Sequence, residues 1–209
     1  MPDGSGDIKR GRKFDQVIEG ARDVFMAEGF EGASVDDIAR AAGVSKATLY
    51  NYFPDKRLLF MEVAKLECRK LADSAIEKID LSRPVRDVLR DGARQMVDFF
   101  TSEFGQRVFR ICVAEGERFP NLGREFFECG PALVREQLKT FFRVAQERGE
   151  LKIDDMDLAA DQFHELCKAD LFMKIVMNLQ TTFSDAEKDR VIDGAVEMFL
   201  ARYGTEAAR

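Results

Sequence analysis

The 209-residue sequence has little of the residue types that build metal and redox sites. It contains one histidine, His164, and four cysteines, which are Cys68, Cys112, Cys129 and Cys167. The cysteines are far apart and form no Cys-x-x-Cys pair, so we expect no zinc or other metal site. Each stands among apolar residues at helical spacing. We therefore expect four small buried hydrophobic side chains rather than redox sensors.

Long apolar runs are also missing. No stretch approaches the roughly 18 apolar residues that span a bilayer. The first ten residues, MPDGSGDIKR, lack the apolar segment of a secretory signal. These absences predict a cytoplasmic protein with no membrane partner.

An excess of positive charge is absent too, because the formal net charge is −6. Residues 1–57 hold nine Lys/Arg and ten Asp/Glu, and residues 58–209 hold 23 and 28. Positive charge is local instead, and its positions are Lys9, Arg10, Arg12, Lys13, Lys46, Lys56 and Arg57. The sequence thus excludes a broad basic surface of the kind that holds nucleic acid by charge alone.

The groups needed for catalysis are not combined anywhere in the chain. Glu115 with Glu117 and Asp154 with Asp155 are carboxylate pairs, but no nucleophile, base or ligand set accompanies them. No glycine-rich loop is present to hold a phosphate. We expect neither a catalytic residue nor a cofactor, and no enzyme.

What the sequence does contain is helical periodicity from end to end. Apolar side chains recur at i, i+3, i+4 and i+7 in residues 14–25 and again in residues 191–200. Gly29 predicts the end of the first helix, and Gly130-Pro131 interrupts a helical segment between residues 121 and 148. A long helix over residues 55–79 connects two halves. The prediction is an all-α fold of about nine helices.

The stretch from residue 34 to 56, SVDDIARAAGVSKATLYNYFPDK, predicts two short helices joined by a tight turn. Ser34 and Ser45 are good N-caps, and Gly43 permits the turn. Ile38 and Ala41 are expected to face the core, as are Leu49 and Phe53. The residues left on the free face of the second helix are Lys46, Ala47, Tyr50 and Asn51, with Thr48 to one side. Such a face suits a DNA major groove, so the stretch is interpreted as a helix-turn-helix.

Residues 14–57 resemble the N-terminal domain of the TetR family of bacterial transcriptional regulators. The match rests on Phe25, Gly29, Phe30 and Lys56, and on residues 34–38, 41–46 and 48–53. AEGERFP at residues 114–120 and FFECGP at residues 126–131 are similar to the effector domain of the AefR-like subgroup. The resemblance implies a helix-turn-helix domain over residues 8–54 and an effector-binding and dimerisation domain over residues 55–205.

The resemblance also implies a repressor that binds a palindromic operator as a homodimer and leaves it when a small-molecule effector binds. The last two helices, about residues 155–178 and 185–203, would pair across the dimer. By position, Ser34, Thr48, Tyr52 and Lys56 match phosphate contacts. Lys46, Ala47 and Tyr50 match base contacts, and Asn51 can do either. Asp36 departs from the pattern, because some members carry a basic residue that reads bases there.

Apolar residues of the second half are candidates for the effector pocket. Phe109, Phe126, Phe163 and Met173 are predicted to line it, and His164 to orient the ligand. Plain core packing is the other interpretation of these residues. Three other functions stay open: an activator, a regulator that senses oxidation through cysteine, and a helical ligand-binding adaptor without DNA binding.

Overall fold

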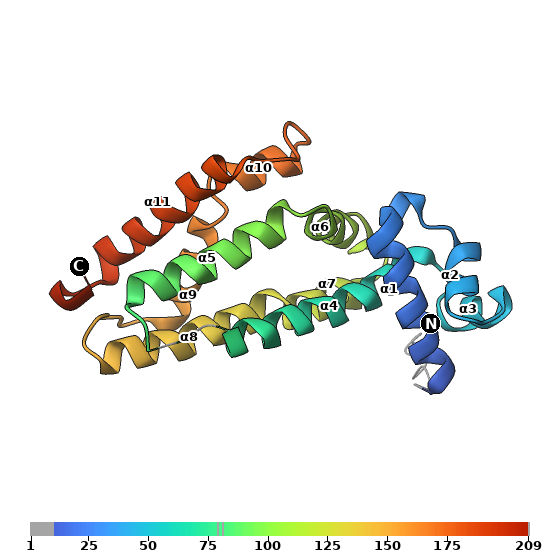
Figure 1. The fold of residues 1–209 in the computed structure, drawn as a ribbon, viewed down its shortest axis with the longest axis horizontal. Coiled ribbons are helices and arrows are strands. Elements are labelled where there is room, and N and C mark those ends of the chain that lie inside the picture. Colours follow the sequence, from blue (N-terminus) through green and yellow to red (C-terminus); the bar gives the residue numbers. More distant parts are fainter. Residues whose placement is uncertain (1–10, 79, 81, 209) are drawn as a thin grey trace. The chain divides into compact units, whose positions relative to one another are not determined.

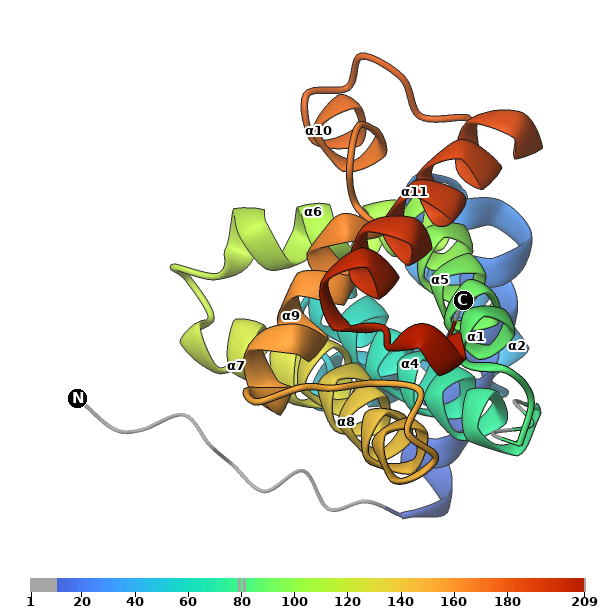
Figure 2. The same cartoon turned by 90° about the vertical axis from the view of Figure 1, so that its left-hand side faces the viewer.

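The computed structural model describes residues 11–78, 80 and 82–208, without the side chains of residues 71–78, 120 and 122. Lys9 and Arg10 of the predicted basic arm lie outside the described residues. The described residues confirm the all-α fold (Figures 1 and 2), with an isolated bridge between Leu151 and Gly204 as their β-type pairing. The helices are α1 (Arg12–Gly32), α2 (Val35–Ala41), α3 (Lys46–Tyr52), α4 (Lys56–Lys78), α5 (Val85–Thr101), α6 (Glu103–Glu115), α7 (Pro120–Cys129), α8 (Pro131–Glu147), α9 (Met156–Leu166), α10 (Leu171–Val176) and α11 (Asp185–Tyr203), followed by a 3-10 helix over Glu206–Ala208.

The chain divides into two compact units inside α4, since the first unit ends at Glu67 and the second begins at Cys68. A single helix therefore belongs to both units. The functional domain limits inferred above, 8–54 and 55–205, stay a prediction.

The first unit is built around the apolar stripe of α1, whose predicted residues are all buried. The chain leaves the helical path at Gly29, with φ of 71°, where the sequence predicts the end of this helix. At Gly20 the two helices α1 and α2 come very close, because a Cβ there would lie 2.5 Å from the backbone nitrogen of Ala42. The ring of Phe60 on α4 closes this core, with its centre 5.1 Å from that of Phe25 and 5.2 Å from that of Phe30.

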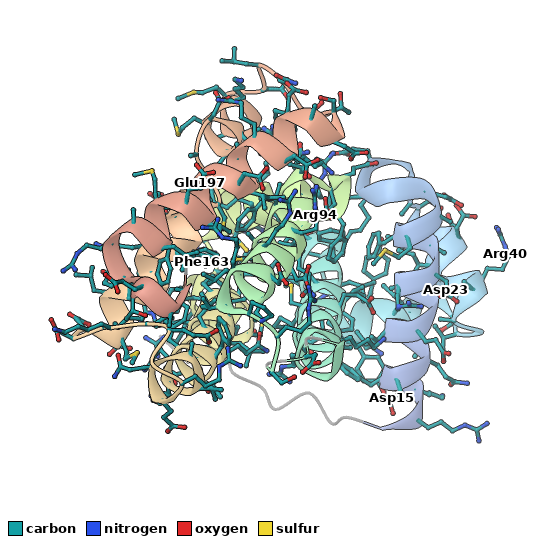
Figure 3. All side chains as sticks on the ribbon, turned by 60° about the vertical axis from the view of Figure 1, so that its left-hand side comes forward. Asp15, Asp23, Arg40, Arg94, Phe163 and Glu197 are labelled. Carbon is teal, nitrogen blue, oxygen red and sulfur yellow. The ribbon has the colours of Figure 1, made fainter. Side chains whose placement is uncertain are left out.

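The second unit has its core where α5, α8, α9 and α11 meet, as the end-on view in Figure 2 shows. Phe142, Phe163 and Phe199 are fully buried there, with ring centres about 5 Å apart in adjacent pairs. Salt bridges join α5 to α11 along its length: Arg90 with Asp193 at 2.6 Å, Lys188 with Asp98 at 2.9 Å, and Arg94 with Asp189 (Arg94 is labelled in Figure 3).

Two helical segments of the prediction are each divided in the described part of the chain. The division between α7 and α8 falls at Gly130, where the sequence predicts an interruption. The prediction of one continuous helix over residues 155–178 was wrong, because the chain breaks between α9 and α10. Asp170 there has φ of 64°, a left-handed conformation that Asp tolerates better than most residues. Its carboxylate bonds Lys174 Nζ at 3.0 Å and also pairs with Arg190.

Within the described residues, no helix combines the length and apolar character needed to cross a membrane.

Candidate DNA-binding and ligand-binding sites

Both short helices of the helix-turn-helix are capped as the sequence predicts. Ser34 Oγ accepts a hydrogen bond from the backbone N–H of Asp37 at 3.1 Å, and Ser45 Oγ accepts one from Thr48 at 3.1 Å. Gly43, with φ of 63°, forms the turn between them, a conformation that favours glycine. The start and direction of α3 are therefore fixed locally.

Burial along α2 and α3 separates a core face from a free face. Ile38, Leu49 and Phe53 are buried as expected, but Ala41 is exposed, so its predicted inward orientation was wrong. Ala39 and Ala42 fill the core instead, because the face of a helix that meets α1 includes positions i+1 and i+4 from Ile38. The free face of α3 is the predicted one, and its exposed residues are Lys46, Ala47, Tyr50 and Asn51.

Lys46 is joined to the residue that departs from the family pattern. Its Nζ lies 2.5 Å from Oδ1 of Asp36, and both side chains are more than half exposed. The pair links the first turn of α2 to the first turn of α3. Because exposed ion pairs contribute only about 0–1 kcal/mol, a DNA phosphate or base can replace it.

Lys56 has a structural role in addition to its predicted one. Its ammonium donates hydrogen bonds to the carbonyls of Phe30 at 2.8 Å and Ala33 at 3.0 Å, and Nζ lies 4.4 Å from the centre of the Phe30 ring. These bonds tie the beginning of α4 to the chain that follows the break in α1. An ammonium has three donors, so a phosphate contact would use the third, and that contact stays a prediction.

Thr48 and Tyr52 are only partly exposed, and each contacts another side chain of the first unit. Thr48 Oγ1 lies 2.9 Å from Ser45 Oγ, and the Tyr52 ring packs edge-on against Phe14 with ring centres 5.8 Å apart. Together with the exposed Ser34, these hydroxyls occupy the positions assigned to phosphate contacts. Their contacts with DNA stay predictions.

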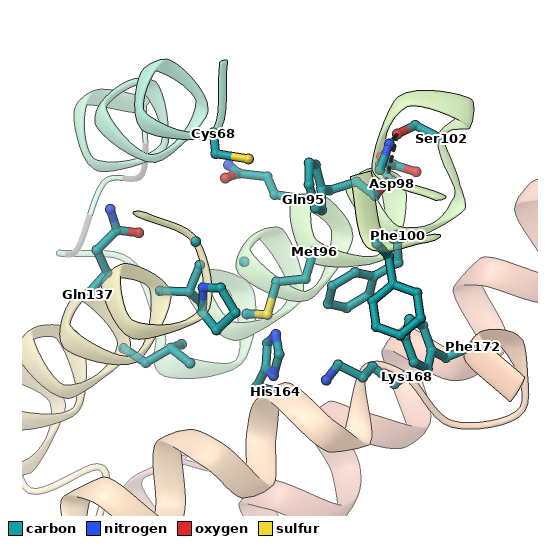
Figure 4. Close-up of a pocket in the computed structure, with 18 of the residues that line it drawn as sticks. Cys68, Gln95, Met96, Asp98, Phe100, Ser102, Gln137, His164, Lys168 and Phe172 are labelled. Carbon is teal, nitrogen blue, oxygen red and sulfur yellow. Dashed lines mark hydrogen bonds between the residues drawn. The ribbon is translucent and has the colours of Figure 1, made fainter. Parts of the chain in front are cut away.

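The second unit contains a cavity of about 790 Å³ (Figure 4). Its walls come from α5 to α10, and Cys68 on α4 completes them. Phe109, Phe126 and His164 line it, as the sequence-based guess places them. The lining also includes residues that sequence reasoning missed: Met96, Phe99, Phe100, Phe104, Phe172 and Lys168.

Two of the predicted pocket residues lie elsewhere. Phe163 is fully buried in the core against Phe199 and lies inside the bundle in Figure 3. Met173 is 58 % exposed on the outside of α10. One residue along a helix turns the side chain by about 100°, so Phe163 faces the core while His164 faces the cavity.

The environment of His164 in the cavity favours the neutral form of its ring. Burial lowers the pKa of His164, and the nearby ammonium of Lys168 lowers it further, against an opposing effect of Glu165. Nδ1 of His164 lies 3.4 Å from Oε1 of Glu165, and its ring packs edge-on against Phe100 at 5.4 Å.

The cysteines match the expectation of small buried side chains. Cys68, Cys129 and Cys167 are buried, and Cys112 is half-buried. Burial raises the pKa of both the Cys112 and Cys167 thiols to about 12. Because the thiolate is the reactive form, this environment disfavours oxidation sensing at these two positions.

The geometry of α2 and α3, with a polar face open to solvent, places the chain among helix-turn-helix DNA-binding proteins. Residues 17–63 match the tetR family of bacterial regulatory proteins, and residues 87–205 match the C-terminal domain of AefR-like transcriptional repressors. The chain belongs to the TetR family of transcriptional regulators, which confirms the resemblance in both halves.

Similar proteins include regulators of known structure. A putative TetR-family regulator from Mesorhizobium loti is 30% identical over 93% of this chain and 98% of that chain, with a TM-score of 0.74. The flavonoid-responsive regulator FrrA is 35% identical over 94% and 100%, with a TM-score of 0.66. The transcriptional repressor AcnR of Corynebacterium efficiens is 33% identical over 79 residues, which are 38% of this chain and 42% of AcnR.

Proposed function

We propose that this regulator is a repressor that binds a palindromic operator as a homodimer and leaves it when a small molecule enters the cavity. The observation that carries the proposal is that one chain contains both α3, the proposed DNA-reading helix with an exposed polar face, and an apolar cavity of about 790 Å³. A cavity of this size suits a small organic ligand. The repressor assignment is supported by the AefR-like match over residues 87–205 and by the likeness to AcnR.

The proposed DNA contacts follow the two faces of α3. Lys46, Ala47 and Tyr50, all exposed, read base edges in the major groove. Asn51 contacts either a base or a phosphate. The phosphate contacts assigned to this surface are Ser34, Thr48, Tyr52 and Lys56.

A dimer is supported by the distribution of exposed apolar side chains. Nine large hydrophobic side chains are exposed in the described part of the chain, and five of them belong to α9–α11 and the loop between α10 and α11. These are Leu158, Met173, Met177, Leu179 and Met198. Clustered exposed apolar residues mark association sites. Two copies of one short reader would also roughly double the contact with a palindrome.

Helix α4 is the proposed route of coupling, because it begins at the reader end and reaches the cavity. Lys56 in its first turn bonds the chain after α1, while Cys68 twelve residues later stands in the cavity wall. A ligand that favours one position of α4 shifts the DNA-binding state only if it binds the two states with different affinities. Because its target is chromosomal DNA, we place the protein in the cytoplasm.

The test is fluorescence anisotropy with a labelled palindrome taken from the DNA upstream of the protein's own gene. We expect Lys46→Ala and Tyr50→Ala each to weaken binding about tenfold or more, since a good base contact contributes about 1–3 kcal/mol. Lys152→Ala is the matched control, because Lys152 is exposed in the second unit. Equal binding by all four proteins would refute the proposed reader.

The direction of regulation is tested in cells with a reporter gene behind the same DNA. Deleting the regulator should raise reporter expression if the protein represses. A fall in expression would instead make it an activator, like the similar protein FasR of Mycolicibacterium smegmatis.

A further inference from the structure

The charged side chains that line the cavity are already paired within the chain. The pairs are Asp98 with Lys188 and Glu136 with Lys139, each at 2.9 Å, and Lys168 with Glu165 at 2.5 Å. A charged ligand would lose its hydration here and would have to compete with one of these partners. The electrostatics of the cavity therefore favour an uncharged ligand.

Several polar side chains of the lining have already used their donors. Ser102 and Thr140 each donate the hydroxyl hydrogen to a backbone carbonyl, at 2.8 and 2.9 Å. Gln106 donates both amide hydrogens to backbone carbonyls, at 3.0 and 2.8 Å. What these groups can offer a ligand is lone pairs.

His164 adds an acceptor among the aromatic rings. The carboxylate of Glu165, 3.4 Å from Nδ1, favours the tautomer with its hydrogen on Nδ1. Nε2 of the neutral ring is then an acceptor. In Figure 4 the ring projects from α9 toward Met96, beside Lys168 and opposite Phe100.

The remaining walls of the cavity favour a flat, apolar ligand. Seven lining side chains are phenylalanines, and the rings of Phe100 and Phe172 meet edge to face with centres 6.1 Å apart. Aromatic guests gain about 0.5–1.5 kcal/mol beyond area burial from such stacked or edge-on contacts. A polar group on the guest must match the acceptors described above, since an unmatched buried polar group is costly.

We infer that the cavity takes an uncharged, hydroxylated aromatic compound, whose hydroxyl donates a hydrogen bond to Nε2 of His164. The inference rests on the proposed use of the cavity as the ligand site. It goes further by naming the ligand class and the residue that selects it.

The test compares three probes of one shape by titration calorimetry on the full-length protein without DNA. The probes are trans-4-hydroxystilbene, trans-4-methoxystilbene and trans-stilbene-4-carboxylate. They carry, respectively, a neutral donor, a neutral acceptor and an anion. We expect the hydroxyl compound to bind about tenfold more tightly than either of the others, the value of one well-placed hydrogen bond.

His164→Phe removes the acceptor and keeps a ring of similar size. In this variant the preference for hydroxystilbene over methoxystilbene should fall to about twofold or less. Methoxystilbene should bind it about as tightly as it binds the wild type, which shows that the cavity is intact. Lys152→Met is the control, because Lys152 is exposed and lies outside the cavity lining, and it should keep the tenfold preference.

Equal binding of the hydroxyl and methoxy compounds to the wild type would overturn the inference, as would tightest binding of the carboxylate or no binding of any probe. Operator binding is measured separately with labelled DNA, first without a probe and then with each probe present. Loss of the hydroxyl preference with intact operator binding refutes the ligand class alone. A preserved preference with operator affinity unchanged by the bound probe refutes the proposed release mechanism alone.

Discussion

At the scale of single residues, the ion pair between Asp36 and Lys46 changes how Asp36 is interpreted. In the sequence, Asp36 stands where some family members carry a basic residue that contacts bases. Base recognition is therefore assigned to α3 in the proposal. In the structure its carboxylate bonds the ammonium of Lys46, the first cation of that helix. In the proposed DNA complex, Asp36 would therefore compete with DNA for Lys46 and limit how strongly this surface binds any sequence.

We predict that Asp36→Asn strengthens binding to operator and to unrelated DNA, by about two- to fivefold at low salt, the range for loss of an exposed ion pair. The plot of log K against log salt should steepen by up to ~0.9, because one more cation can neutralise a phosphate. Anisotropy titrations at several salt concentrations measure both quantities. Asp15→Asn, which removes an exposed charge from α1, is the control, and an equal change there would mean that only net charge matters.

The single histidine gives a second prediction, for stability against pH. The folded-state pKa of His164 is lowered, chiefly by burial. As pH falls below the unfolded-state value near 6.5, the unfolded chain takes up a proton that the folded chain does not. Stability should therefore decline from pH 7 to pH 5.5. Urea unfolding should show a flatter profile for His164→Phe over this range; parallel profiles would contradict the assignment.

At the scale of elements, features set by nearby residues could be predicted from the sequence, and features set by tertiary packing could not. Ser34, Ser45 and Gly43 determine their own caps and turn, so the sequence was sufficient for α2 and α3. The break at Asp170 contains no glycine or proline that would have predicted it. The Asp170 carboxylate is instead bonded by Lys174 and by Arg190, which is distant in the sequence. Likewise, a periodic pattern shows that Phe163 and His164 are helical, but only tertiary packing decides which of them faces the cavity.

The close approach of α1 and α2 gives a prediction at this scale. Gly20→Ala should destabilise the protein by about 1–3 kcal/mol, the usual range for overpacking, because the new methyl would lie 2.5–2.8 Å from atoms of Ala42. Gly123→Ala is the control within α7, where an added Cβ would have no atom within 4 Å beyond its chain neighbours and the backbone of its own helix. Helix propensity alone predicts a gain of roughly 0.5–1 kcal/mol there. Urea midpoints measure both, and equal shifts would contradict the close approach.

At the scale of the whole molecule, the two units differ in how much their sequence reveals. The reader domain needs particular residues at particular positions, so a short motif identified it. The cavity needs only apolar side chains that converge from six helices and from Cys68 in the middle of α4. Such convergence depends on packing between distant segments, so the sequence placed three cavity residues and missed the others.

Assembly gives the last prediction, because a palindromic operator requires two readers held together. Met198 on α11 is 63 % exposed, and Met198→Glu would place a charge within the proposed interface. We expect this variant to elute as a monomer in light-scattering chromatography and to lose at least tenfold in operator affinity. Met26→Glu is the control, since Met26 is 46 % exposed on α1 in the first unit. A dimeric Met198→Glu protein with full operator affinity would exclude this surface as the interface, and α9 and α10 would then have to be tested separately.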